Sequence, residues 1–216
     1  MRTVRGAGDD RQVRKGFARI ADKVDGPIGV VDGHHQHLGL LDAGRAQQVE
    51  PAGVDLGHVA EIEGPTGLAI VTVAEDGENS IVVIAGANDA MDAGRVRAAA
   101  EVISAARIVV CQGEIPRDGI EALPALVTGR FLHNPAPVME LDPAVLRASD
   151  PLVVNQHEAG LVLAQLAPGQ EAPEDPEAVV AALRAAGIPS AVLTLGADGS
   201  LVADQAGVRR IPPAPV

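Results

Sequence analysis

Residues 152–163 read LVVNQHEAGLVL, and this stretch decides the fold. One apolar run ends at Asn155 and another begins after Glu158, so the pattern predicts a buried strand that leads into a helix. Asn155 placed three residues before Glu158 predicts a capping box at the start of that helix. The same amide and carboxylate at a helix N-terminus could also hold water on Mg²⁺ and contact phosphate oxygens. The two interpretations are compatible, because one carboxylate can serve both.

The chain from residue 65 onward repeats this alternation of strand and helix. Two β-rich runs around Asp76-Gly77 predict a hairpin within residues 65–86. Strands that alternate with helices predict an α/β fold, a mostly parallel sheet with helices on both faces. Further strands are predicted at 107–113, 130–137, 150–155 and from 190 onward, and helices at 92–106, 116–127, 142–149, 158–167 and 175–187.

Composition excludes several classes of partner. The chain of 216 residues has a net charge of −12, which repels nucleic-acid backbones and anionic membranes. With two Phe and no Tyr or Trp, it offers few stacking platforms for bases. Cys111 is the single cysteine, so no disulfide can form within the chain and a reducing compartment is expected. Without a long apolar run or a signal peptide, the sequence predicts a soluble, cytoplasmic protein.

Charge divides the chain near residue 50. Residues 1–50 are nearly balanced, contain both lysines (Lys15 and Lys23) and show poor periodicity, whereas residues 51–216 are strongly acidic. We therefore expect 1–50 to be an atypical, weakly structured segment and 51–216 to form the α/β core. A histidine cluster in the first segment favours a surface loop over a metal site, since no acidic or cysteine cluster accompanies it: His34, His35 and His37.

Polar clusters stand where the predicted strands end. In an open parallel sheet, ligands bind beyond the carboxyl ends of the strands. Any one cluster could be an ordinary cap or turn, and a Gly-rich turn alone is weak evidence. Clusters on successive strands would face a single crevice. They are Gln112-Gly113-Glu114, Asn134 with Pro135, Asn155 with Glu158, and Thr194 to Gly199.

The clusters, taken in this order, resemble those of ribokinase and its relatives, the PfkB carbohydrate kinases. The resemblance covers residues 65–216, and GVDLGHV (53–59) also fits the segment that leads into the family's lid. The stretches that carry it are PTGLAIVTVAEDGENSIVVIAGAN (65–88), VVCQGEIP (109–116), NPAP (134–137), VNQHEA (154–159) and LTLGADG (193–199).

The resemblance implies a three-layer ribokinase-like fold with a small β lid near 65–86, through which two subunits could form a homodimer. It implies ATP-dependent phosphorylation of a sugar hydroxyl, with ribose as the expected substrate. Glu114 matches the residue that contacts the sugar. Asn155 and Glu158 match the Asn-x-x-Glu motif, with Asn155 on the nucleotide and Glu158 on Mg²⁺ through water, although Gln156 replaces the usual Glu. The nucleotide-binding turn matches Thr194, Gly196 and Gly199, and a monovalent cation is a further possible cofactor.

The family's remaining motifs are missing from the positions where the resemblance implies them. The Gly-Ala-Gly-Asp motif with the catalytic base should follow a stretch like RRIPPAPV (209–216), and the sugar-binding N-terminal motifs are not found in residues 1–50. The base is therefore unassigned, and we expect an incomplete chain with little or no kinase activity. The alternative is a catalytically inactive nucleotide- or sugar-binding protein. RGAGDD (5–10) offers Asp9 as a permuted base, but the charged segment that follows argues against it.

Overall fold

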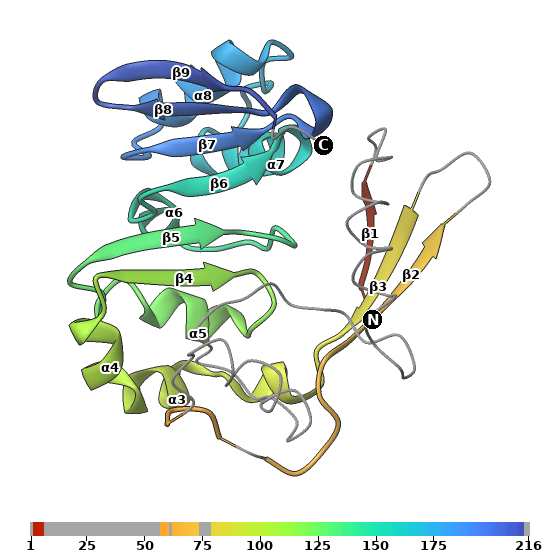
Figure 1. Ribbon diagram of the computed structural model, residues 1–216, viewed down its shortest axis with the longest axis vertical. Helices are drawn as coiled ribbons and strands as arrows, with labels where there is room; N and C mark the ends of the chain where they lie inside the picture. Colours follow the sequence, from red (N-terminus) through yellow and green to blue (C-terminus); the bar gives the residue numbers. More distant parts are fainter. Residues whose placement is uncertain (1, 7–56, 61, 74–78, 214–216) are drawn as a thin grey trace. The chain divides into compact units, whose positions relative to one another are not determined.

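The computed structural model describes residues 2–6, 57–60, 62–73 and 79–213. The chain divides into two compact units, Met1–Met91 and Asp92–Val216 (Figure 1). This boundary lies well beyond the change of charge near residue 50. Asp9, His34, His35 and His37 lie outside the described residues, so the predictions made for them stay predictions.

The second unit is built on one mixed sheet of six strands. The strands stand side by side in chain order (Figure 1). The first four strands are parallel to one another. The fifth strand is antiparallel to the fourth, and the sixth is antiparallel to the fifth. This confirms the predicted α/β class with a mostly parallel sheet. The strands are β4 (Ile108–Gln112), β5 (Arg130–Asn134), β6 (Leu152–Asn155), β7 (Ala191–Thr194), β8 (Ser200–Asp204) and β9 (Gly207–Ile211).

Helices connect the parallel strands, and their starts follow the sequence signals. Asp92, Asp142 and Asp175 each cap a helix by accepting a hydrogen bond from a backbone N–H in its first turn. The predicted helix at 92–106 is two short helices, because Ala99 leaves the helical region with ψ of 13°. The helices are α3 (Ala93–Ala98), α4 (Ala100–Ala105), α5 (Arg117–Ala122), α6 (Pro143–Arg147), α7 (Gln156–Leu166) and α8 (Pro176–Ala185).

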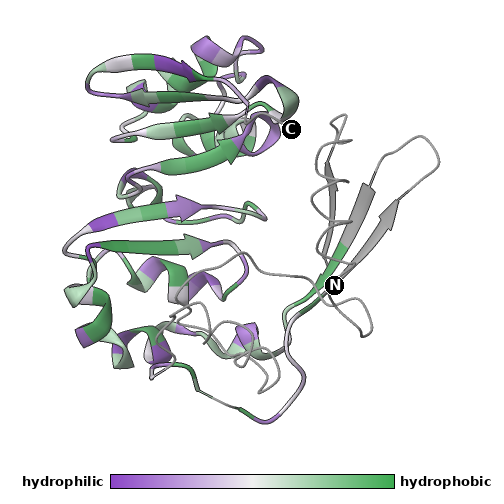
Figure 2. Ribbon diagram, in the orientation of Figure 1, coloured by the Kyte–Doolittle hydropathy of each residue, from purple (hydrophilic) through white to green (hydrophobic). Residues whose placement is uncertain are grey.

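The core lies on one face of this sheet. Alternate residues of five neighbouring strands are buried and, by the strand register, share that face. α7 packs against β6 and β7, and α8 packs against β7 and β8. Figure 2 shows that β4 and β6 consist mainly of apolar residues. The buried strand residues are Val109, Cys111, Phe131, His133, Leu152, Val154, Ala191, Leu193, Leu201 and Ala203.

The opposite face of the sheet is more open. Ile108 and Val110 are 55% and 46% exposed there. Leu132 and Val153, on the next two strands, are half-buried. Helices on both faces were expected from the strand–helix alternation, but over Ile108 and Val110 no second helical layer is seen in the described part of the chain.

The first unit contains a small antiparallel sheet. β2 (Leu68–Val73) and β3 (Asn79–Ile84) pair in antiparallel register, which confirms the hairpin predicted within 65–86. The predicted turn at Asp76-Gly77 lies outside the described residues. β1 (Arg2–Gly6) pairs with the free edge of β3, although it belongs to the segment expected to be weakly structured. A 3₁₀ turn, η2 (Gly86–Ala90), follows the hairpin.

Candidate active site

The carboxyl ends of β4 to β7 bring the predicted site residues to one edge of the sheet. Gln112 is the register partner of Asn134, and Asn155 is the partner of Thr194. Since β5 stands next to β6, the four polar clusters follow one another along this edge in the order β4, β5, β6, β7. Ligands of open α/β sheets bind at such an edge. The sequence therefore predicted correctly that these clusters share one edge.

Asn155 and Glu158 form a capping box at the start of α7. Asn155 Oδ1 accepts a hydrogen bond from the Glu158 N–H, and Glu158 Oε2 accepts one from the Asn155 N–H, each at 2.8 Å. Glu158 Oε1 accepts no hydrogen bond from the residues that the structure describes. The capping interpretation is confirmed, and it uses only one of the two carboxylate oxygens.

Burial sets the electrostatics of Glu158. Its half-buried position raises the pKa of the carboxyl, while the Asn155 N–H and nearby His157 act in the opposite direction. A partly desolvated carboxylate is stabilised by any cation that reaches it. Mg²⁺ is commonly held by one or two carboxylates together with water and phosphate oxygens, and Glu158 fits that role. Among the described residues no three acidic, His or Cys side chains form a metal cluster, so water and phosphate would have to complete the coordination.

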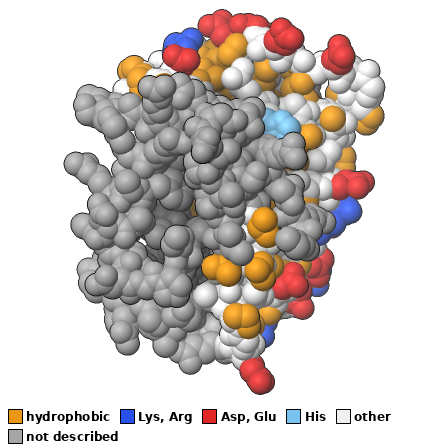
Figure 3. Space-filling model, turned by 90° about the vertical axis from the view of Figure 1, so that its right-hand side faces the viewer, with side chains coloured by type: hydrophobic (Ala, Val, Ile, Leu, Met, Phe, Trp, Pro, Cys, Tyr) orange, Lys and Arg blue, Asp and Glu red, His pale blue; other side chains and the backbone are white. Residues whose placement is uncertain are grey.

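The acidity of the chain disfavours a negative ligand unless a cation accompanies it. The last lysine in the sequence is Lys23, and the net charge is −12. Figure 3 shows acidic side chains along the rim of the described surface on the face it presents, with fewer basic ones among them. An anion such as a nucleotide phosphate would therefore depend on backbone N–H groups at the start of α7 and on a metal ion.

The turn from Thr194 to Gly199 follows β7. It contains a 3₁₀ turn, η3 (Gly196–Asp198), and is closed by a hydrogen bond from the Leu195 N–H to the Gly199 carbonyl at 2.8 Å. Gly196 has φ of +57° and open space around a would-be Cβ. A Cβ on Gly199 would lie 2.2 Å from the Ile211 carbonyl oxygen, so Gly199 is required by the fold of the β8–β9 hairpin. Gly196 has no such steric reason and lies exposed at the site.

Glu114 stands in the turn after β4 and is exposed. The preceding residue, Gly113, donates its N–H to the Ala136 carbonyl at 3.1 Å. A Cβ on Gly113 would lie 2.2 Å from the Pro137 carbonyl oxygen, so only glycine permits this approach. The turn that carries Glu114 is therefore packed directly against the loop that follows β5.

His133 is the buried imidazole nearest in sequence to this edge, but it belongs to the core. It stacks on Phe131 with ring centroids 5.3 Å apart, and its Nδ1 lies 3.3 Å from Ser149 Oγ. Burial lowers the pKa of His133 to about 4. Because strand side chains alternate between faces, His133 points to the helix-covered face while Asn134 points to the other. His133 is therefore not a candidate general base.

Two residues hold the loop after β5, one at its start and one at its far end. Asn134 Nδ2 donates to the Val153 carbonyl at 2.8 Å, close to the point where the β5–β6 ladder ends. Gln165 of α7 bonds to the backbone on both sides of Glu140. Sequence reasoning missed Gln165, because its only signal is one amide in the helical stretch EAGLVLAQLA.

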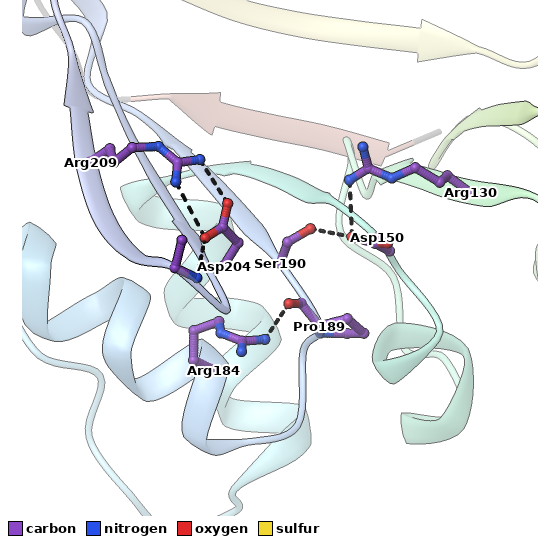
Figure 4. Close-up of polar contacts among 8 residues, drawn as sticks. Arg130, Asp150, Arg184, Pro189, Ser190, Asp204 and Arg209 are labelled. Atoms are coloured by element: carbon purple, nitrogen blue, oxygen red, sulfur yellow. Dashed lines mark hydrogen bonds and ion pairs between the residues drawn. The ribbon is translucent and has the colours of Figure 1, made fainter.

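The opposite edge of the sheet is held by a separate polar network, drawn in Figure 4. Asp150 accepts hydrogen bonds from Ser190 Oγ and from the Arg130 guanidinium, and these bonds lower the pKa of its carboxyl, Ser190 contributing most. Arg184 donates to the carbonyls of Ile188 and Pro189. These residues stand at or just before the starts of β5, β6 and β7, away from the candidate site.

Fold and site together define an α/β protein with polar clusters along one edge of its sheet, at the carboxyl ends of the parallel strands. The family profile described as "pfkB family carbohydrate kinase" matches residues 43–216, most of the chain. The chain therefore belongs to the pfkB family of carbohydrate kinases.

The relatives it matches include ribokinases. It is 34% identical over 153 residues to ribokinase from Schizosaccharomyces pombe, which covers 68% of this chain and 48% of that protein. It is 37% identical over 151 residues to ribokinase from Mus musculus, covering 67% of this chain and 45% of that protein. The chain thus spans about half the length of the curated relatives it matches.

Solved structures share the fold. Ribokinase from Thermotoga maritima superposes with a TM-score of 0.67 at 22% identity, covering 80% of this chain and 56% of that one. Ribokinase from Arabidopsis thaliana, solved with ribose and ATP, gives a TM-score of 0.64 at 24% identity, covering 82% of this chain and 60% of that one. In the part of the chain that the structure describes, no helix is long and apolar enough to cross a membrane.

Proposed function

We propose that this chain serves the ATP-dependent phosphorylation of a sugar hydroxyl, with ribose as the substrate. The observation that carries the proposal is the capping box of Asn155 and Glu158 beside Thr194, at the carboxyl edge of a parallel sheet. Membership of the pfkB family and the ribokinase relatives support the same chemistry. Phosphoryl transfer depends mainly on positioning and charge neutralisation, which a site of this kind can supply.

Each part of the site has a proposed role. Glu114, exposed in the turn after β4, accepts hydrogen bonds from sugar hydroxyls. Asn155 and the exposed N–H groups of the first turn of α7 face the phosphates, and the turn that contains Thr194, Gly196 and Gly199 holds the nucleotide. Glu158 holds Mg²⁺ through water, with Oε1 as the available oxygen. Mg²⁺ would neutralise phosphate charge, and a monovalent cation is a further cofactor suggested by the family.

A coupled ADP-release assay with ribose and Mg-ATP tests the proposal. Ribose-dependent turnover supports a sugar kinase, and a panel of other pentoses, hexoses and nucleosides then defines the substrate. Isothermal titration calorimetry with ATP and with ribose, each alone, provides the second readout. Affinity without turnover would favour the alternative, a nucleotide- or sugar-binding protein. Absence of both binding and turnover would contradict the proposal.

We also propose that the hairpin of β2 and β3 forms a lid and joins two subunits. Leu68 and Ile84 are register partners near the open ends of these strands, and they are 37% and 47% exposed. Burying exposed apolar side chains of this kind against a second protein surface is energetically favourable. Light scattering checks the expected homodimer, and Ile84→Glu should shift it toward a monomer.

A single cysteine, buried as Cys111, supports a cytoplasmic location.

A further inference from the structure

The loop from residue 135 to 141 is bonded to two other parts of the second unit, the turn after β4 and helix α7. At its start, the Ala136 carbonyl accepts a hydrogen bond from Gly113, the residue before Glu114. Next to it, Asn134 reaches from the end of β5 to the backbone of β6 at Val153, two residues before Asn155. The loop therefore contacts the turn that carries the proposed sugar residue, and Asn134, just before the loop, contacts the strand that leads to Asn155.

Gln165 ties the other end of this loop to α7. Its Nε2 donates to the Met139 carbonyl at 3.0 Å, and its Oε1 accepts from the Leu141 N–H at 3.1 Å. Leu141 is only 3% exposed, so its N–H needs a protein partner. Both ends of the Gln165 amide are thus used, and both partners are backbone groups. Because both partners are backbone groups, the Gln165 side chain fixes the path of the loop independently of the loop's own side chains.

We infer that Gln165 is a positioning residue that makes the sugar half and the nucleotide half of the site act together. α7 begins at the capping box of Asn155 and Glu158, and Gln165 lies near its other end. Through Gln165 the same helix also holds the loop whose Ala136 carbonyl anchors the turn of Glu114. This inference rests on the proposed function for the identity of the two ligands. It assigns to Gln165 a role that composition and motif gave no reason to expect.

Two substitutions of Gln165 and one control test the inference. Gln165→Ala removes both hydrogen bonds, while Gln165→Glu keeps the acceptor for Leu141 but places an oxygen against the Met139 carbonyl. Leu161→Ala is the matched control, since Leu161 lies on the same helix, is 43% exposed and has no hydrogen-bonding group in its side chain. Two quantities are measured: amide hydrogen exchange at Leu141, Ala136 and Gly113, and the ATP affinity with and without ribose.

Gln165→Ala should speed exchange at Leu141 and, through the loosened loop, at Gly113, and should weaken ATP and ribose binding by about fivefold each. It should also reduce the factor by which ribose changes the affinity for ATP, which a purely structural role would leave unchanged. Gln165→Glu should keep Leu141 protected but loosen Gly113, and Leu161→Ala should change none of these readouts.

Two results would overturn the inference. One is a Gln165→Ala protein that melts earlier but keeps the wild-type exchange at Gly113 and the wild-type effect of ribose on ATP affinity. The other applies if the wild-type protein binds neither ATP nor ribose. The proposed function then fails, and the hydrogen-exchange measurement alone tests the role of Gln165. Unchanged exchange at Gly113 in Gln165→Ala would then refute the link, and faster exchange would retain it.

Discussion

Asn155 and Glu158 cap each other's backbone across the first turn of α7, at the carboxyl edge of the parallel sheet. A cap alone would explain both residues, because reciprocal bonds of this kind satisfy two N–H groups that the helix leaves unpaired. The position of the cap adds a second reason: Thr194 is the register partner of Asn155, and the other polar strand ends follow along the same edge. Substitutions can separate the two reasons.

Asn155→Ser should separate capping from ligand binding. Serine is as good a helix cap as asparagine, so the stability should stay close to that of the wild type. Asn155→Ala removes the cap and should cost about 1 kcal/mol, or about 3 °C in Tm. If Asn155 contacts phosphate, both variants lose ATP affinity, although only one loses stability. Thermal melts and calorimetry check this, and full ATP affinity in Asn155→Ser would leave Asn155 with the capping role alone.

Glu158→Gln should keep the helix and lose the metal. Glutamine can also accept the hydrogen bond from the Asn155 N–H, so the capping box survives. The charge is lost, and the Mg²⁺ dependence of ATP binding should fall by about tenfold. Titrating Mg²⁺ against ATP affinity measures this, and an unchanged Mg²⁺ dependence would remove Glu158 from the metal site.

The raised pKa of Glu158 also predicts how binding changes with pH. Burial makes this carboxyl take up a proton at a higher pH than an ordinary glutamate, so Mg-ATP binding should weaken early as the pH falls from neutral. The Glu158→Gln protein should lack that part of the pH dependence. Calorimetry over a pH series compares the two proteins, with Asn155→Ser as the variant that keeps the carboxylate.

Particular residues show how much of the fold and of the site could be predicted from the sequence. The capping box was readable because its two members lie three residues apart, within one helical turn. The order of polar clusters along one edge was readable because parallel strands alternate with helices. The role of Gln165 was not readable, since its partners lie 24 and 26 residues away and are backbone groups.

Other differences have similar causes. Ala99 breaks the helix expected at 92–106, although alanine is the best helix former, so tertiary context overrode local propensity there. The exposure of Ile108 and Val110 could not be read from an apolar run, because such a run does not say what covers it. The pairing of β1 with β3 joins residues more than seventy positions apart, beyond any local pattern.

Gly199→Ala and Gly196→Ala should differ in stability and in binding. Both residues have positive φ, so alanine is strained at either position by about 1 kcal/mol or more. At Gly199 the new Cβ would also collide with the Ile211 carbonyl, so this variant should lose at least about 2 kcal/mol more. At Gly196 the Cβ meets open space, and reduced ATP affinity should be the main effect. Equal destabilisation of both variants in urea would contradict this difference.

His133 should make the protein sensitive to acid. Its pKa is lowered from 6.5 to about 4 by burial, so the unfolded chain binds a proton more readily than the folded one. The contribution of His133 to the free energy of unfolding is complete above the unfolded pKa of 6.5. It is lost as the pH falls from 6.5 to about 4, on the order of 3 kcal/mol in all. His133→Leu removes the titrating ring and its unpaired Nε2, and should flatten the fall in unfolding free energy between about pH 6.5 and 4. Urea unfolding at several pH values measures the slope.

Asp150→Asn serves as the control, because the carboxyl of Asp150 titrates at lower pH and its loss should leave that window unchanged. If the slope persists in His133→Leu, the acid sensitivity belongs to another group.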